Sequence, residues 1–391
     1  MNRRLMAALA VILFATACAP LSRSAPPTAP ETAEAPLLQP GRPVRNIILM
    51  IGDGMGVSHI TAARTVQGRL NLDRFRTAGL IATHSFSHFI TDSAAAGTAL
   101  STGFKTFNRG ISVLPGGAPL KTLVAHAEEA KMATGIVVTS RVTHATPAAF
   151  YANAVSRRLE HAIAEQLLPS GLDVILGGGL ALFLPRTDPR SAREDEKDLL
   201  AAFRSSHEVV TTPEAFAELA TPRRLIGLFS RSHLPSSDDR TVSLNRMTAK
   251  ALSILSAHPG GFFLMVEGSQ IDWEGHDNDS DGVIRETLDF DRVVGTVLDF
   301  ATKREDTLVL VTSDHETGGY AILKGSVVDR RITKTDFATE SHTGQMVPMF
   351  SAGPRAALFG GIHDNTYVGK TLIALVKARK TETPSPARAG Q

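Results

Sequence analysis

The chain has 391 residues, of which 43% are hydrophobic and 20% are charged. This supply of apolar side chains is enough for a globular core, and it excludes disorder or a collagen-like repeat as a description of the whole chain. The 41 Lys and Arg residues nearly balance the 39 Asp and Glu residues, so the charge gives no reason to expect a nucleic acid partner. The single cysteine, Cys18, excludes an internal disulfide and a cysteine-based zinc site.

Residues 1–17 have the pattern of a signal peptide. Arg3 and Arg4 precede an uncharged and mostly apolar run over residues 6–17, which is too short to span a bilayer as a helix. Small residues directly before Cys18 resemble a bacterial lipobox, in which this cysteine becomes the acylated N-terminus. We therefore expect an exported, periplasmic protein that is lipid-anchored to the outer membrane and has no other membrane contact. An ordinary cleaved secretory signal and twin-arginine export stay open as alternatives.

Residues 18–43 continue from the cysteine as a proline-rich tether with no run able to form a core. At the other end, residues 380–391 are rich in Pro, Thr and Ala and are expected to form a flexible tail. The folded domain is therefore expected over residues 44–379.

Short apolar runs alternate with amphipathic segments along this domain. Runs without alternation predict strands buried on both faces, at residues 46–51, 135–139, 173–176, 262–266, 307–311 and 347–351. Apolar residues at three- and four-residue spacing predict helices from about residue 58 and over residues 120–131, 244–257 and 283–303. This order predicts an α/β fold with helices on both faces of a mainly parallel sheet. The charged and weakly patterned residues 186–239 are expected to form a peripheral insertion.

Acidic, hydroxyl, imidazole and guanidinium groups follow the predicted strands, at the edge where ligands bind in such sheets. They are Asp53, Ser93, His144, Thr146, Arg157, Glu267, Asp272, His276, Asp314, His315 and His342. Each has an ordinary explanation when it is taken alone, such as a helix cap, a turn residue or a solvated surface charge. That explanation does not account for the recurrence of such groups after successive strands.

The carboxylates and imidazoles of this set suffice for two zinc ions with nitrogen and oxygen ligands, plus a harder ion on the remaining oxygens. Four converging carboxylates would repel each other strongly without cations, so their convergence favours bound metals. Two neighbouring metals can hold the attacking and leaving oxygens of a phosphoryl transfer. The set therefore predicts metal-assisted phosphoryl chemistry.

Six ordered motifs resemble those of the alkaline phosphatases and span roughly residues 46–353. They are Gly52-Asp53-Gly54-Met55-Gly56, Asp92-Ser93-Ala94-Ala95, His144-Ala145-Thr146-Pro147-Ala148, Glu267-Gly268-Ser269-Gln270-Ile271-Asp272 with His276, Asp314-His315, and His342-Thr343-Gly344. The resemblance implies the alkaline phosphatase-like three-layer α/β/α sandwich over residues 44–379. It also implies hydrolysis of small-molecule phosphate monoesters through a phosphoserine on Ser93, with Arg157 as the residue that clamps the phosphate.

The resemblance further implies two Zn²⁺ ions and one Mg²⁺ ion as cofactors, and it assigns a ligand group to each. The groups are Asp272, His276 and His342 for one zinc; Asp53, Asp314 and His315 for the other; and Asp53, Thr146, Glu267 and, through water, His144 for magnesium. Homodimers are common in the family.

Two positions depart from the family pattern. His144 stands where some members have aspartate, which leaves the identity of the third metal open. Trp273 stands where other members have charged or polar residues, and it is either a core residue or a hydrophobic wall of the substrate mouth. Two other functions also stay open. One is a phosphodiesterase or related phosphoryl or sulfuryl hydrolase of the same superfamily, and the other is a non-catalytic lipoprotein that binds phosphate or zinc.

Overall fold

The computed structural model of the protein describes residues 43–379. The predicted signal peptide, Cys18, the tether up to residue 42 and the tail at residues 380–391 therefore lie outside the described residues. Within residues 43–379, no helix combines the length and the apolar character needed to cross a membrane.

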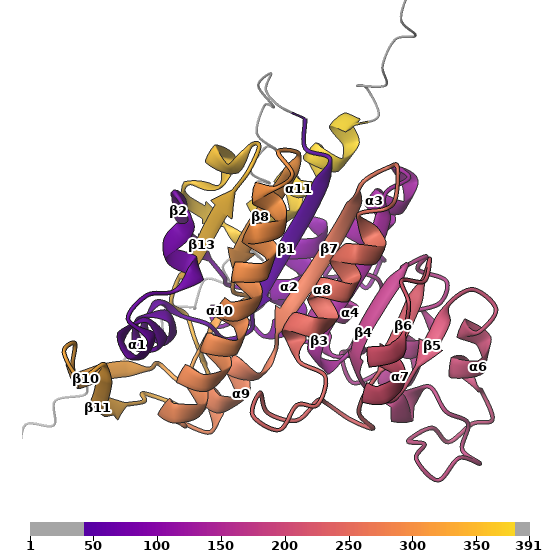
Figure 1. The fold of residues 1–391 in the computed structure, drawn as a ribbon, viewed down its shortest axis with the longest axis horizontal. Coiled ribbons are helices and arrows are strands. Elements are labelled where there is room, and N and C mark those ends of the chain that lie inside the picture. The colour runs from indigo at the N-terminus through magenta and orange to yellow at the C-terminus, as the bar shows by residue number, and fades with distance from the viewer. Residues whose placement is uncertain (1–42, 380–391) are drawn as a thin grey trace, which may run out of the picture. The chain divides into compact units, whose positions relative to one another are not determined.

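A single large sheet, ten strands wide within the described range, is the centre of the fold (Figure 1). From edge to edge its strands are β14 (Gly361–Asp364), β2 (Thr77–Ala82), β13 (Val347–Ala352), β8 (Thr307–Thr312), β1 (Asn46–Gly52), β7 (Phe262–Gly268), β3 (Ala133–Arg141), β4 (Val174–Gly178), β6 (Leu225–Leu228) and β5 (Glu208–Val210). Neighbouring strands pair in parallel except at β13, which is antiparallel to both β2 and β8. The prediction of a mainly parallel sheet is therefore confirmed.

The central strands are apolar along their whole length because both of their faces are buried. In β1, Ile47 and Leu49 pack into the apolar cluster on one face, and Ile48 and Met50 pack into the cluster on the other. Side chains alternate across a strand, so a strand covered on both faces needs apolar residues at every position. This is the physical reason why continuous apolar runs predicted the central strands.

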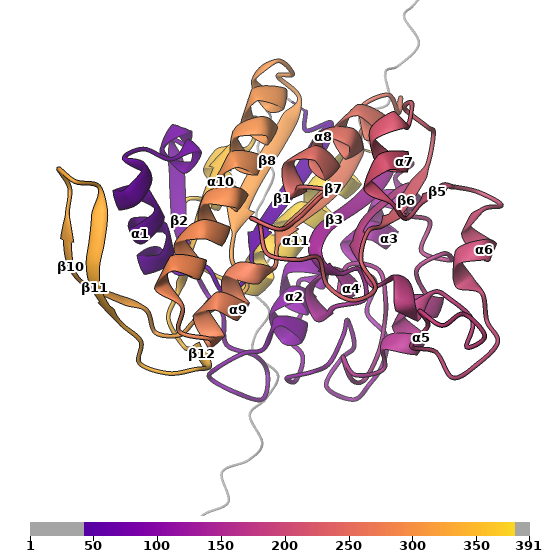
Figure 2. The ribbon, with the colours of Figure 1, turned by 60° about the horizontal axis from the view of Figure 1, so that its bottom comes forward.

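Two helical layers cover the sheet, one on each face (Figures 1 and 2). One layer contains α2 (Ser93–Thr102), α3 (Leu123–Glu129), α4 (Ala145–Ala148) and α11 (Asn365–Ala378). The other contains α1 (Val57–Gln67), α8 (Leu244–Leu255) and α10 (Ser280–Thr302). The predicted three-layer α/β/α sandwich is confirmed.

The remaining elements lie around these layers. They are helices α5 (Glu160–Glu165), α6 (Leu199–Phe203), α7 (Pro213–Glu218) and α9 (Gln270–His276); 3-10 helices η1 (Asn71–Arg74), η2 (Leu180–Leu182) and η3 (Ala356–Phe359); and the paired strands β9 (Glu316–Thr317) with β12 (His342–Thr343) and β10 (Ala321–Ser326) with β11 (Arg331–Asp336).

The expectation of a peripheral insertion over residues 186–239 is wrong. This segment supplies β5 and β6, which pair in parallel with each other and with β4 and so extend the main sheet to its edge. Both strands are short, and β5 presents Glu208 to solvent, so they lack the long apolar run that marks the central strands.

Candidate metal centre and nucleophile

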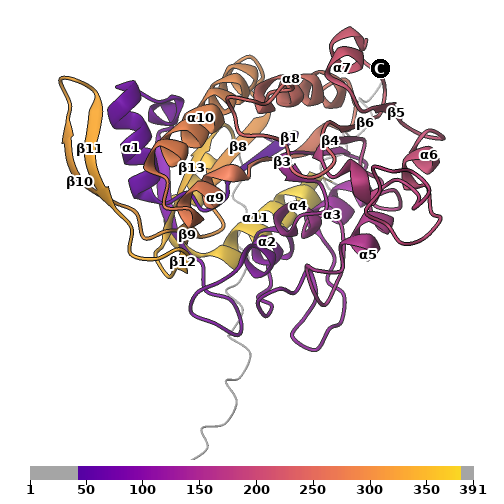
Figure 3. The same ribbon diagram turned by 90° about the horizontal axis from the view of Figure 1, so that it is seen from below.

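The predicted site residues all lie at one edge of the sheet, formed by the carboxyl ends of β1, β3, β7 and β8. Figure 3 shows the molecule from the side of this edge. Asp53 follows β1, Asp314 and His315 follow β8, and His144 follows β3 at the start of α4. The other members come from the end of β7, from α2, α4, α9 and β12, and from the loop before α5. They are Glu267, Ser93, Thr146, Asp272, His276, His342 and Arg157. Parallel strands bring their carboxyl ends to one edge, which is why the sequence order of these residues predicted their convergence.

The turn after β1 requires a glycine at position 54. Gly54 has a φ of 73°, and a Cβ added there would lie 2.7 Å from the Cα of Asp272. Its backbone N–H donates to Asp314 Oδ1 at 3.2 Å, and the backbone N–H of His315 donates to the same oxygen at 3.0 Å. These two contacts leave Asp314 Oδ2 facing the site.

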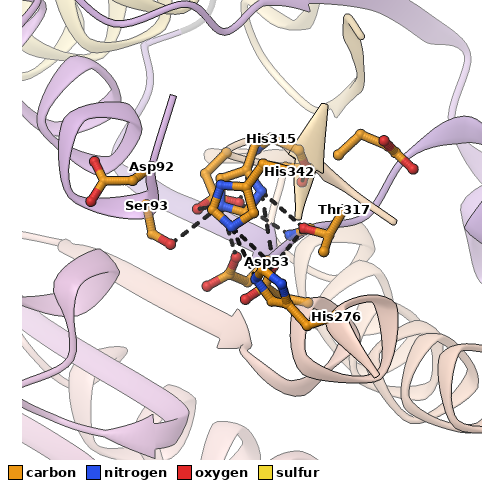
Figure 4. Close-up of polar contacts among 12 residues, drawn as sticks. Asp53, Asp92, Ser93, His276, His315, Thr317 and His342 are labelled. Atoms are coloured by element: carbon orange, nitrogen blue, oxygen red, sulfur yellow. Dashed lines mark hydrogen bonds and ion pairs between the residues drawn. The ribbon is translucent and has the colours of Figure 1, made fainter. Parts of the chain in front are cut away.

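The first group contains Asp272, His276 and His342, whose ligand atoms lie within 4.8 Å of one another (Figure 4). Each histidine donates its Nδ1–H to a backbone carbonyl, His276 to Glu340 at 2.7 Å and His342 to Thr91 at 2.9 Å. A carbonyl only accepts, so the Nε2 atoms of both neutral rings carry lone pairs.

Those lone pairs face each other across a short gap. The two Nε2 atoms are 3.1 Å apart, and Asp272 Oδ1 is 3.4 Å from that of His276 and 3.5 Å from that of His342. A cation placed between these three atoms would remove the repulsion among their lone pairs. Fixing each ring by a hydrogen bond from its other nitrogen is the usual arrangement of metal-binding histidines.

The second group surrounds His315 Nε2. This atom is 3.2 Å from Asp314 Oδ2, 3.5 Å from Asp53 Oδ1 and 3.2 Å from Ser93 Oγ. Asp53, Asp272 and His315 also satisfy the distance limits of a metal-binding group, so Asp272 lies between the first and second groups.

A third group is formed by Asp53, His144 and Glu267, so Asp53 is shared with the second group. Thr146 adds a hydroxyl whose Oγ1 donates to Asp53 Oδ2 at 3.4 Å. Both carboxylates are fully buried. Two of these groups contain only residues that the resemblance assigned together to one metal, whereas the group around His315 has Asp272 where the resemblance assigned Asp314.

The charges of this site are not balanced by the described part of the chain. Burial, and then the neighbouring charge of Asp314, raise the pKa of Asp53 well above its usual range. Burial also raises the pKa of Glu267 to about 8 and, with the charge of Asp272, the pKa of Asp314 to about 6. Within residues 43–379, Asp53 Oδ1, Glu267 Oε1 and Asp314 Oδ2 have no hydrogen-bond partner.

Unpartnered buried oxygens of this kind cost free energy unless a cation binds them. The imidazole of His315 is kept neutral, because burial and the nearby His342 lower its pKa well below the usual value. Neutral imidazoles and ionised carboxylates are the forms that bind divalent metals. The donor set therefore fits divalent metal ions.

Ser93 is the first residue of α2, and the preceding Asp92 holds it in place. Asp92 caps the helix by accepting the backbone N–H of Ala95 at 3.1 Å. Its other carboxylate oxygen is 3.2 Å from Arg157 Nη1. The guanidinium of Arg157 is also 2.9 Å from His144 Nε2, so two contacts fix it beside the serine.

Thr317 is a residue of the site that sequence reasoning missed. Its hydroxyl donates to Asp272 Oδ1, and its oxygen lies 3.2 Å from His315 Nδ1. Because the single hydroxyl proton is used on the carboxylate, the oxygen accepts from Nδ1–H and leaves His315 Nε2 free for the site. Its position two residues after His315 was the available signal, but its contact with Asp272 depends on the fold.

Trp273 is half-buried beside the site. Its ring centroid lies 4.4 Å from that of His233 and 6.3 Å from that of His144, with both pairs edge to face. The tryptophan therefore forms, with His233, an aromatic wall next to the third group, and its role at a substrate mouth stays a prediction.

Comparisons with known proteins point to one family. The family model described as alkaline phosphatase matches residues 44–330. Alkaline phosphatase 4 of Bacillus subtilis is 38% identical over 300 residues, which cover 71% of this chain and 63% of that relative. Alkaline phosphatase 3 of the same organism is 31% identical over 423 residues, which cover 84% of this chain and 88% of that relative.

Solved structures agree with the sequence matches. The structure of alkaline phosphatase from the Antarctic bacterium TAB5 has a TM-score of 0.80 at 37% identity, and the match covers 86% of this chain and 98% of that one. A variant of the TAB5 protein, in which one histidine is replaced by aspartate, has Mg bound in its M3 site and matches with a TM-score of 0.79.

Proposed function

Because this chain belongs to the alkaline phosphatase family, we propose that it hydrolyses phosphate monoesters and releases inorganic phosphate through a phosphoserine on Ser93. The observation that carries the proposal is the position of Ser93 Oγ, 3.2 Å from His315 Nε2, inside a set of buried carboxylates that each have one oxygen without a hydrogen-bond partner in the described range.

The chain's own residues account for the positioning that the reaction needs. Ser93 Oγ attacks the phosphorus, the bond from phosphorus to the leaving alcohol breaks, and water then hydrolyses the phosphoserine. Arg157 can bind two phosphoryl oxygens bidentately, since Asp92 and His144 hold its guanidinium beside the serine. Phosphoryl transfer depends on such positioning and on neutralised charge more than on covalent help.

The proposed cofactors are two Zn²⁺ ions and one Mg²⁺ ion. Asp272, His276 and His342 would hold one zinc, and Asp53, Asp314 and His315 the other. The magnesium would take Asp53, Glu267 and Thr146, with His144 acting through water. When bound, the ions neutralise the charge of the phosphoryl oxygens and make the Ser93 hydroxyl a stronger nucleophile. The TAB5 variant with Mg in its M3 site supports the third position.

A monoester should be preferred over a diester. The site concentrates Arg157 and three cation positions on one phosphoryl group, and a diester offers one fewer charged oxygen to them. We expect kcat/KM for p-nitrophenyl phosphate to exceed that for bis-p-nitrophenyl phosphate by at least about 100-fold. This factor is the usual loss of rate when one contact that stabilises charge in the transition state is removed. The reverse order would favour a phosphodiesterase. Zinc binding without turnover of either ester would favour the non-catalytic lipoprotein.

The cellular location is part of the same proposal. We propose export to the periplasm and attachment to the outer membrane through an acylated Cys18, supported by the arginines and apolar run before it. Cys18→Ser should move the protein from the membrane fraction to the soluble periplasmic fraction. Equal membrane association of both forms would contradict acylation. The homodimer implied by the family resemblance stays a proposal, which sedimentation of the metal-loaded protein would test.

A further inference from the structure

A second cluster of cationic side chains lies along the same sheet edge, beside the site described above. A surface cavity of about 570 Å³ lies at the carboxyl ends of β3, β4 and β6. Its charged lining consists of Arg141, Arg158, Glu160, His161 and Arg231. The three ligand groups use the ends of β8, β1, β7 and β3, so β3 belongs to both places.

The cavity and the site share two connections. Arg157, beside Ser93, is followed directly by Arg158, which lines the cavity. Arg141 Nη1, on the cavity side, lies 2.6 Å from His233 Nε2, and the His233 ring packs on Trp273. The aromatic wall therefore contacts the cavity lining through His233 and the third ligand group through His144.

The cavity carries excess positive charge. Its one carboxylate, Glu160, is neutralised by Arg141 through contacts of 2.7 Å and 2.8 Å. Arg231 donates to the backbone carbonyls of Arg190 and Ser191, and it has no carboxylate partner in the described range. Arg158 is exposed, and its guanidinium has no hydrogen-bond or ion-pair partner among residues 43–379. Two guanidinium groups are therefore left without a counter-charge.

Guanidinium groups bind phosphate oxygens bidentately, and clefts lined by one sign of charge concentrate ions of the other sign. We propose that this cavity binds a second phosphate group of the substrate while the first lies at Ser93. The inference rests on the proposed function and narrows its substrate class to phosphate monoesters that carry another phosphate. In the sheet, β7 is two strand spacings from β4 and β1 is three. The two phosphates would therefore lie roughly 10–14 Å apart.

The test compares hexanediol bisphosphate with hexyl phosphate on the metal-loaded enzyme. The two ends of the bisphosphate are equivalent, so a site that ignores the second phosphate gives a kcat/KM ratio near two. We expect kcat/KM for the bisphosphate to be about ten times that for hexyl phosphate or more. A factor of about ten is the low end of what one charge-assisted hydrogen bond contributes to binding. Arg158→Gln combined with Arg231→Gln should return the ratio to near two, whereas Arg158→Lys should keep part of the preference.

Arg204→Gln is the matched control, because Arg204 is also an exposed arginine but does not line the cavity. A wild-type ratio near two, or an equal fall of the ratio in the control, would overturn the inference. In both outcomes hexyl phosphate is still hydrolysed, so the proposed function stands. If the wild type hydrolyses neither hexyl phosphate nor p-nitrophenyl phosphate, the proposed function fails and this inference fails with it.

Discussion

Replacing Ser93 with alanine is expected to lower kcat for p-nitrophenyl phosphate by at least about 10³-fold, because removing a nucleophile removes the covalent route as a whole. The hydroxyl is the only group lost, since Ser93 is the first residue of α2 and its Cβ stays in the same place. The cap of that helix comes from Asp92 and is kept. Steady-state kinetics together with zinc and magnesium content measure the effect.

Ser101→Ala is the control for this variant. Ser101 is buried in the same helix, and its hydroxyl accepts the backbone N–H of Leu123 at 3.3 Å, away from the ligand groups. It should lose some stability and keep kcat within about twofold of wild type. Turnover by Ser93→Ala at the wild-type rate, with normal metal content, would exclude the serine as the nucleophile.

Removing the metals should destabilise the protein, and more so as the pH rises. Ions that bind only the folded state add to its stability. We expect chelation at pH 8 to lower Tm by roughly 10 °C or more, which corresponds to several kcal/mol for two tightly bound ions. Elemental analysis before and after chelation gives the ion count, with two zinc and one magnesium expected per chain.

The pH dependence follows from the raised carboxyl pKa values. In the metal-free folded state the pKa of Glu267 is about 8 and that of Asp314 is about 6, both raised first by burial. In the unfolded chain both groups titrate near pH 4, so between pH 4 and pH 8 the folded state binds more protons. The contribution of these two groups to the stability of the metal-free protein is therefore fully present below about pH 4 and is lost as the pH rises toward 8. Bound cations keep these groups ionised and remove the effect.

The gap in Tm between the metal-loaded and metal-free forms should therefore widen from pH 5 to pH 8. Burial also raises the pKa of Glu128, to about 7. This group titrates in both the metal-loaded and the metal-free form, so its effect cancels in the difference between their Tm values. Glu267→Gln should flatten the slope of the metal-free form, because it removes a titrating group. A gap that stays constant with pH would mean that these carboxylates do not interact with the ions.

The central strands could be predicted from the sequence because a strand buried on both faces needs apolar residues at successive positions. β1, β3, β7 and β8 each contain an apolar run without alternation, and all of them were predicted. Strand β2, which lies next to the edge strand β14, was not predicted, because five of its six residues are partly or fully exposed and the apolar run is lost. The antiparallel direction of β13 depends on the connection through which the chain returns to the sheet. The residues of the strand itself do not indicate this direction.

The candidate site could be predicted because its residues follow strand ends, where the fold itself brings them together. The contacts that hold these side chains in place could not be predicted from the sequence. Thr317 reaches Asp272 across 45 positions in the chain, and Arg157 reaches Asp92 across 65. Such pairs are made by the packing of α2, α9 and β9 against the sheet edge, so only the structure reveals which polar groups position the others.

Identification of a phosphorylated residue would show directly whether Ser93 is the nucleophile. The metal-loaded protein is incubated with a phosphate monoester, quenched in acid and digested, and the peptides are mapped by mass spectrometry. We expect one phosphoryl group on Ser93, absent from Ser93→Ala. A phosphoryl group on another residue, or none in an enzyme that turns over the same ester, would contradict it.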